Sequence, residues 1–493
     1  MQRVLNILLL PVTATVAAVR WFGNASVAAR IAWIVALFQV VVVVLALVVV
    51  LSTRDRAIIQ SWWSPGKGLV LLLLMALVPL LVYRAARLWL ERQDGRWPDI
   101  AAAWETAIAE LGRQQVFLAE SPLFLVLGSD GGEFERALFA EMSPALVVEQ
   151  SPLGGGPLHV FASHDAVFVC CSGTGQTSVV AAAVRSAIAD EGHAIAGGKA
   201  IADHAAVGQE SEAVVAAVQT ASQRRLPLRS ASERREASDR LAYACEQVRQ
   251  ARIPLAAING VVVLLPVQVN HAAEADATSI GQAVSEDLAT VTRVLGVRAP
   301  VTFVAGVLQD DPAIDELMSR LDASSRSAAC GQPFPPGLPP TPEHLQALAL
   351  NAIGSLNDRL ANLLLDPRRI AQDVANRQLL ALLLRLRLHV STQVHRVLQQ
   401  TFTPELPVNV DGRPGVLPLL AGCYLASISP NANRRAFVQG LLDRVVHLQG
   451  ELDWTDESLR AEAWARRTSR VLFALAAAFV VAILAIVWWK ATR

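Results

Sequence analysis

The chain has 493 residues, a formal net charge of zero, 53% hydrophobic residues and only 17% charged residues. A neutral chain has no basic field that would collect nucleic acid, so nucleic acid is excluded from the expected partners. The charged fraction is below the roughly 25% of an ordinary soluble protein, and the apolar excess is concentrated at residues 31–83 and 471–489.

The N-terminal apolar region predicts a membrane hairpin within residues 1–97. Residues 31–51 carry no charge and are long enough to cross a hydrocarbon core of about 30 Å as a helix. Residues 69–83 are shorter, but two tryptophans precede them and a tyrosine ends them, as at a membrane interface. We expect the return span there. Residues 4–19 are interrupted by Pro11 and predict an interfacial helix.

A third span is predicted at residues 471–489, which are also free of charge. Arginines gather on one side of each predicted anchor: Arg84, Arg87, Arg92 and Arg96 after the hairpin, and Arg466, Arg467 and Arg470 before the last span. Because arginine-rich flanks stay in the cytoplasm, the long region between the anchors is expected to be cytoplasmic.

Residues 98–330 predict an α/β domain with a largely parallel sheet, because short apolar runs alternate with segments of helical periodicity. The expected strands are residues 123–127, 166–171, 261–267 and 301–305, and the expected helices are residues 100–111, 178–189 and 280–295. Residues 190–238 are rich in alanine and weakly periodic, and we interpret part of them as an insertion.

A proline-rich linker is predicted at residues 331–342, where the chain reads GQPFPPGLPPTP. Beyond it, residues 343–470 show apolar residues at spacings of three and four, which predicts an all-α extension leading to the last span. The five cysteines include no CxxC pair and have no metal-like spacing to histidine, so we expect buried free thiols, a reducing compartment and no metal site.

The most informative segment is residues 121–135, SPLFLVLGSDGGEFE, in which an apolar strand leads through a glycine turn into a helix. Phosphate-binding loops occupy this context, because glycines let backbone N–H groups face phosphates at a helix N-terminus. The glycines of the turn are Gly128, Gly131 and Gly132.

The residues that follow the turn do not suit a nucleotide. If Gly128 begins a GxxxxGK[ST] motif, its last three positions hold Glu133, Phe134 and Glu135. The lysine is thus replaced by phenylalanine and the Mg²⁺-binding hydroxyl by a carboxylate. The two glutamates would repel a triphosphate, so the turn is more simply a tight strand-to-helix connection than a nucleotide site.

Nearly the whole chain resembles the IcmF/TssM proteins of type VI secretion. Two N-terminal spans, a strand of the LVLG type, a helical extension and a third span occur in the order of that family. The family's INGV-type strand is matched by AINGVVV at residues 257–263, and its LLRGVYFTS-like element by LLAGCYLAS at residues 419–427. Residues 435–452 are similar to the stretch before the family's third span.

The resemblance implies a P-loop GTPase-like domain, but two further nucleotide motifs have lost their charged residues. Where the family has DTAG, this chain has Ser172, Gly173, Thr174 and Gly175, without the aspartate that organises Mg²⁺. Where the guanine-reading [NT]KxD element is expected, residues 306–309 read GVLQ. We therefore expect a pseudo-GTPase that has no catalytic residues, binds no cofactor and retains only a switch remnant at Ser172 and Gly175.

Other polar residues offer candidate sites. Ser172 lies in SGTGQ, but no histidine and acid are placed in the sequence to activate it, so we do not expect a nucleophile. His159 and His164 could form a metal pair, but isolated surface histidines are the simpler interpretation. The glycines at residues 154–156 lack basic neighbours, which favours a flexible turn.

By this resemblance the chain is expected to be a non-enzymatic scaffold at the bacterial inner membrane, within a type VI secretion-like complex. The implied partners are TssL-like membrane subunits and TssK-like baseplate subunits. Because four residues follow position 489, a separate chain is expected to supply the family's periplasmic arm. The rival hypotheses are a nucleotide-binding or nucleotide-hydrolysing switch with an atypical P-loop, and a membrane regulator or transport accessory unrelated to secretion.

Overall fold

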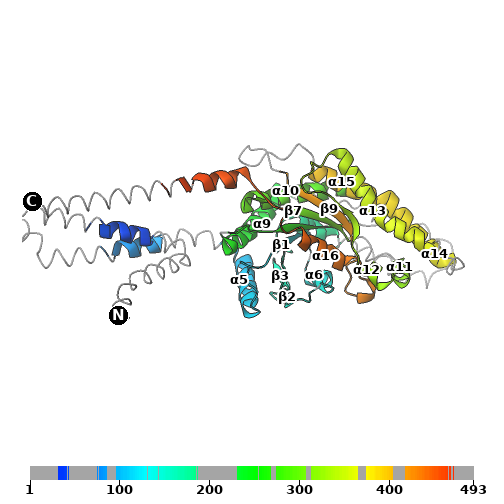
Figure 1. The fold of residues 1–493 in the computed structure, drawn as a ribbon, viewed down its shortest axis with the longest axis horizontal. Helices are drawn as coiled ribbons and strands as arrows, with labels where there is room; N and C mark the ends of the chain where they lie inside the picture. The colour runs from blue at the N-terminus through cyan, green and yellow to red at the C-terminus, as the bar shows by residue number, and fades with distance from the viewer. Residues whose placement is uncertain are drawn as a thin grey trace, which may run out of the picture. The chain divides into compact units, whose positions relative to one another are not determined.

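The structure is a computed structural model, shown in Figure 1. It describes residues 32–41, 43, 75, 77–85, 96–129, 131–142, 144–184, 186, 230–253, 255–267, 274–306, 313–364, 373–402, 417–464, 466, 467 and 470.

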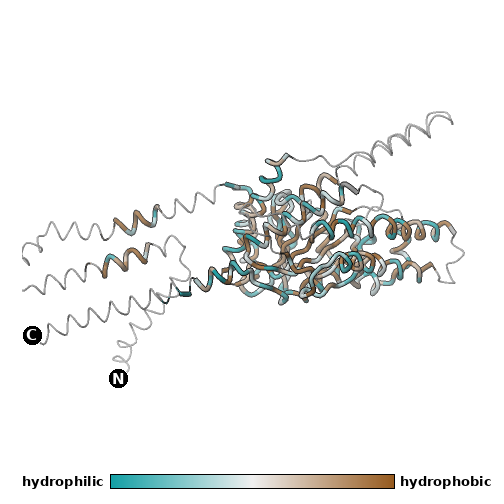
Figure 2. Tube along the Cα trace, turned by 90° about the horizontal axis from the view of Figure 1, so that it is seen from above, coloured by the Kyte–Doolittle hydropathy of each residue, from teal (hydrophilic) through white to brown (hydrophobic). Residues whose placement is uncertain are grey.

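The chain forms two compact units, one of residues 1–98 with 461–493 and one of residues 99–460. In the first unit, the structure describes helical fragments at residues 32–41 and 77–85, which Figure 2 colours mostly as hydrophobic. Within the described residues, every helix is too short or too polar to meet the requirements of a membrane span. The hairpin spans predicted at 31–51 and 69–83 are described only in these fragments and two single residues, and the predicted segments 4–19 and 471–489 lie outside the described residues.

The second unit is built on an eight-stranded sheet with the order β2-β3-β4-β1-β5-β7-β9-β8, and the labelled strands β2, β3, β1, β7 and β9 follow one another in this order in Figure 1. The five strands from β4 to β9 pair in parallel, whereas β2, β3 and β8 join antiparallel at the two edges. The strand bounds are β1 (Leu123–Leu127), β2 (Val148–Ser151), β3 (His159–Ala162), β4 (Val167–Cys170), β5 (Gly260–Leu265), β7 (Pro300–Ala305), β8 (Cys330–Pro333) and β9 (Leu419–Leu425). The predicted α/β domain with a mostly parallel sheet is therefore confirmed.

The central strands are apolar on both faces because helices cover both faces of a parallel sheet. Every residue of β1, β5, β7 and β9 is buried. The helices are α5 (Pro98–Arg113), α6 (Gly132–Phe139), α9 (Ala231–Arg252), α10 (Glu274–Leu295), α11 (Ile314–Arg320), α12 (Ala323–Ser327), α13 (Pro342–Leu364), α14 (Asp373–Arg385), α15 (Ser391–Thr401) and α16 (Val438–His447). A π-helical segment η1 (Leu386–Val390) joins α14 to α15, and a 3-10 turn η2 (Ala432–Arg434) precedes α16. A separate pair of short strands, β6 (Val297–Arg298) and β10 (Asp453–Trp454), completes the unit.

One face of the sheet packs against α6 and α16. Phe124 and Phe168 stack at 5.2 Å between ring centroids, and Phe139 of α6 contacts Phe161 and Phe168 at 4.7 and 4.9 Å. Such aromatic pairs contribute about 0.5–1.5 kcal/mol beyond their buried area. This aromatic layer holds the C-terminal end of α6 against the sheet.

The prediction of an all-α region at residues 343–470 is wrong in one respect. The run at residues 419–425, assigned to the helical extension, forms β9 and pairs in parallel with β7. A short, fully buried apolar run cannot be assigned to a helix or a strand from periodicity alone. The sheet also continues into the predicted linker, because β8 at Cys330–Pro333 pairs with β9.

Candidate functional site at the glycine turn

The turn after β1 has the strand-to-helix geometry predicted from the sequence. Gly128 has φ +80° and Gly131, which precedes the first residue of α6, has φ +134°. Both angles are in the region that L-residues rarely adopt, so glycine is required by the backbone.

Packing also accounts for Gly128, whereas at Gly132 the nearest atoms belong to the end of one flexible side chain. A Cβ on Gly128 would collide with the carbonyl oxygen of Leu264 in β5 and lie 3.1 Å from a methyl group of Thr177. A Cβ on Gly132 would lie 2.7 Å from Nε2 of Gln150, whose side chain covers the start of α6. Neighbouring segments of the same chain thus fill the space beside Gly128 and Gly132.

The three residues at the degenerate motif positions have different surroundings. Glu133 is exposed, and Phe134 is partly buried against the aromatic core. Glu135 is completely buried. A buried carboxylate requires hydrogen-bonding partners, because desolvation of an unpaired charge is costly.

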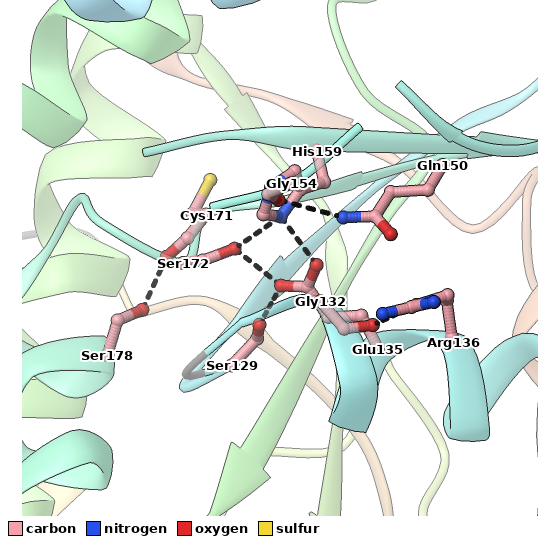
Figure 3. Close-up of polar contacts among 10 residues, drawn as sticks. All are labelled: Ser129, Gly132, Glu135, Arg136, Gln150, Gly154, His159, Cys171, Ser172 and Ser178. Carbon is pink, nitrogen blue, oxygen red and sulfur yellow. Dashed lines mark hydrogen bonds and ion pairs between the residues drawn. The ribbon is translucent and has the colours of Figure 1, made fainter. Parts of the chain in front are cut away.

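These partners form the Glu135 cluster, which consists of Ser129, Glu135, His159 and Ser172 (Figure 3). The hydroxyls of Ser129 and Ser172 donate to Oε1 of Glu135, and Nδ1 of His159 lies 2.7 Å from Oε2. Ser129, Glu135 and His159 have no exposed surface, whereas Ser172 is half-buried. The cluster joins the turn, α6, β3 and the loop after β4.

Both ring nitrogens of His159 face acceptors. Nε2 lies 2.9 Å from the carbonyl oxygen of Gly154, which can only accept, so Nε2 carries a proton. Nδ1 faces the Glu135 carboxyl group, and the proton between them resides on one side or the other. The pair is therefore either an imidazolium–carboxylate ion pair or a neutral imidazole with a protonated acid, and in both cases its net charge is zero.

One expectation from the sequence is wrong here. His159 is buried in β3 rather than at the surface, although His164 is exposed as predicted. Ser172 does have a histidine and an acid within hydrogen-bonding distance, because His159 and Glu135 reach it from other elements. The residues at 154–156 were interpreted as a flexible turn, yet the carbonyl of Gly154 accepts from both His159 and Gln150.

The arrangement differs from that of a catalytic triad. In a triad the nucleophile and the acid contact opposite nitrogens of the imidazole. Here Ser172 and Glu135 both contact Nδ1 of His159, at 3.2 and 2.7 Å, and Nε2 is used by the Gly154 carbonyl. The histidine cannot relay a proton from the serine to a leaving group in this geometry.

The loop of residues 172–177, which we call the switch-like loop, is held by a second buried carboxylate. Asp287 of α10 accepts from the backbone N–H groups of Gln176 and Thr177 at 2.9 and 2.7 Å and thereby caps the helix that begins at residue 176. Gly175 has φ +85°, and a Cβ there would lie 2.8 Å from Oδ2 of Asp287. Burial raises the pKa of Asp287 to about 6.

Other helices also fix this loop. Arg240 of α9 donates to the carbonyl oxygen of Gly173 at 3.2 Å and forms an ion pair with Asp99 of α5. The side-chain amide of Gln176 donates to the hydroxyl of Ser238 at 3.0 Å. The loop therefore takes its conformation from contacts within the chain.

Nucleophilic thiols and clustered metal ligands are not features of the described region. All five cysteines are free and buried, and burial raises the pKa of Cys171, next to the loop, to about 12. Among the described residues, no group of three or more His, Cys, Asp or Glu side chains could hold a metal ion. The expected position of the guanine-reading element, residues 306–309, lies outside the described residues except for Gly306.

Comparison with known proteins adds one finding. Residues 234–429 match the family model described as the IcmF-related N-terminal domain. The matched region begins in α9, includes β5, β7 and β9, and lies after the glycine turn and the switch-like loop. No curated protein and no solved structure matches the chain.

Proposed function

We propose that the chain is a non-enzymatic scaffold. The match to the IcmF-related N-terminal domain at residues 234–429 supports this, because it is consistent with the IcmF/TssM family and suggests a type VI secretion-related protein. The chain would serve in the membrane complex of a type VI secretion-like system at the bacterial inner membrane. Its α/β domain would link membrane subunits to baseplate components in the cytoplasm.

The observation that carries the non-enzymatic part is the position of Glu135. Its carboxylate lies beside the glycine turn, fully buried, and accepts hydrogen bonds from Ser129 and Ser172. A phosphate at such a turn needs backbone N–H groups and a cation, whereas this turn places the carboxyl group of Glu135, paired with His159, beside the helix N-terminus. A nucleotide would have to displace a satisfied carboxylate and separate it from His159.

The strand order supports the interpretation as a pseudo-GTPase. The first strand, β1, lies inside the parallel part of the sheet between β4 and β5, and the glycine turn and the switch-like loop both follow carboxyl ends of adjacent strands, β1 and β4. Ligands of open α/β sheets bind at this edge. In a GTPase the γ-phosphate and Mg²⁺ order the switch loops, but here Asp287 and Arg240 hold the corresponding loop.

The membrane placement rests on the sequence. The uncharged segments at 31–51 and 471–489 and the arginine flanks beside them support anchoring with the large unit in the cytoplasm. TssL-like membrane subunits and TssK-like baseplate subunits are the proposed partners, and a separate chain would supply a periplasmic arm.

Nucleotide binding to the purified full-length chain in mild detergent tests the pseudo-GTPase part. Fluorescent GTP and ATP analogues are titrated with and without Mg²⁺, and we expect no saturable binding up to millimolar nucleotide. Saturable binding that requires Mg²⁺ and is lost in Gly128→Ala, but kept in Gly155→Ala, would establish the rival hypothesis of an atypical nucleotide switch.

Co-purification tests the scaffold part separately. The tagged full-length chain is isolated in mild detergent from cells that produce TssL-like and TssK-like subunits. Recovery of both subunits at constant ratios is the expected result. Recovery of neither, together with a transport complex, would instead favour the accessory role.

A further inference from the structure

A row of leucines on the outer side of the α14–η1–α15 helix is exposed to solvent. Leu380, Leu384 and Leu388 follow one another at intervals of four residues and are 47%, 48% and 62% exposed. The opposite side of the same helix seats it on the domain through the fully buried Leu379, Leu382, Leu386 and Val390. The exposed row, which we call the leucine ridge, is therefore additional to the face that the fold uses.

The π-helical segment η1 lies in the second half of the leucine ridge. Four residues of an α-helix advance about 40° beyond one full turn, so a row at intervals of four drifts around the helix. A π-helical turn contains more residues than an α-helical turn and offsets this drift between Leu384 and Leu388. π-Helical segments are rare and occur frequently at functional sites.

The charge around the ridge is mainly positive. From Asp373, the first residue of α14, to Thr401, the last residue of α15, the sequence contains four arginines and one acidic residue, Asp373 itself. Arg387 lies between two ridge turns and is exposed. The acidic side chains of α11, which contacts α14, are already paired: Asp315 with Arg434 and Glu316 with Arg320. Asp358 of α13 is exposed, but α13 and the α14–η1–α15 helix together still have a positive net charge.

We propose that the leucine ridge with Arg387 is a docking surface for an acidic amphipathic helix of a partner protein. Rows at intervals of four are the ridges that fit between the side-chain rows of a second helix. Arginine and carboxylate pair in bidentate geometry at such interfaces. The inference rests on the proposed scaffold role only because it requires a partner.

A lipid surface fits the ridge less well. Helices that lie in a membrane interface present a broad apolar face, commonly with tryptophan or phenylalanine. Residues 374–401 contain no aromatic residue, and the ridge is one residue wide. The shape and composition fit a helix rather than a bilayer.

Site-specific photo-crosslinking in the native cell tests the proposal. Benzoyl-phenylalanine replaces Leu388 in the full-length chain, and Leu459, which is 49% exposed on another helix, receives the same replacement as a matched control. Mass spectrometry identifies the captured segment. We expect the Leu388 position, but not the Leu459 position, to capture an acidic segment with apolar residues at helical spacing.

Charge reversal provides the second arm. Arg387→Glu should reduce the yield of this crosslink at least tenfold while leaving the thermal unfolding midpoint unchanged, because the side chain is exposed. Capture of lipid, of a basic or neutral segment, or of nothing above the Leu459 control would overturn the proposal. Co-purification of secretion subunits can succeed in each of these cases, so the two failures are distinguishable.

Discussion

Glu135 and His159 form a buried pair in which Nδ1 of His159 lies 2.7 Å from Oε2 of Glu135. Neither side chain has any exposed surface. The two residues are 24 positions apart and come from α6 and β3. The pair fastens the first turn of α6 to the strand beside β4, so a polar contact holds the beginning of this helix and the aromatic layer holds its end.

Removal of the Glu135 carboxylate should strongly destabilise the α/β unit. Glu135→Ala leaves the His159 ring and two serine hydroxyls without their acceptor, and loss of one member of a buried pair costs about 3–5 kcal/mol. Urea titration of the purified chain measures the free energy of unfolding. Glu133→Ala, at the exposed glutamate two residues earlier, should change it by less than about 0.5 kcal/mol. Equal effects of the two variants would contradict a structural role for the pair.

A methyl group at Gly128 should be costly without any ligand present. Gly128→Ala combines a strained positive φ with a collision against the Leu264 carbonyl, and we expect a loss of at least about 2 kcal/mol in unfolding free energy. Gly155→Ala is the matched control, because a Cβ there meets nothing within 4 Å. If Gly128→Ala were as stable as Gly155→Ala, packing would not explain the glycine.

Local signals in the sequence were sufficient to predict the turn and its strand. β1 begins and ends at the predicted residues, because LFLVL is an apolar run bounded by proline and glycine. The long helices α10 and α13 were likewise predictable from their periodicity. The order and register of the strands in the sheet were not predictable. The strand β9, for example, pairs with β7 and β8 although several helices separate it from β8 in the sequence.

The Glu135 cluster was only partly predictable. A histidine inside the apolar run LHVFA was a signal of burial, because a polar residue between buried strand residues needs a partner. The identity of that partner depends on the pairing of β3 with β4 and on the packing of α6, which no local pattern encodes. The role of Asp287 was not predictable for the same reason. Asp287 accepts a hydrogen bond from the backbone N–H of Thr177, which is 110 residues away in the sequence.

Ser172 should not behave as a nucleophile, although it contacts a histidine. Ser172 and Glu135 both contact the same ring nitrogen of His159, Nδ1. A fluorophosphonate probe should therefore leave the full-length chain unlabelled. Ser172→Ala should cost about 1 kcal/mol through the lost hydrogen bond to Glu135. Labelling that disappears in Ser172→Ala would instead identify an active serine.

Asp287 should make the stability of the domain fall as the pH rises from about 4 to about 6. Burial raises the pKa of Asp287 to about 6 from its ordinary value of 3.8, so in this range the folded chain retains a proton that the unfolded chain has lost. Below the range both states are protonated, and above it the folded state contains a desolvated carboxylate. A shift of about two pKa units corresponds to about 3 kcal/mol, which is the full penalty above pH 6.

Comparison with Asp287→Asn isolates this contribution. Asparagine keeps one oxygen to accept from the amides of Gln176 and Thr177 but does not titrate, so its loss of capping is independent of pH. Unfolding free energies of both chains are measured from pH 4 to pH 7, with Glu133→Gln at an exposed carboxylate as the control. The wild-type chain should lose up to about 3 kcal/mol relative to Asp287→Asn across this range. The unfolding free energies of the wild type and Asp287→Asn could differ by the same amount at every pH, or Glu133→Gln could differ from the wild type with the same pH dependence. Either result would mean that Asp287 is charged at pH 4 and that its two backbone contacts outweigh its burial.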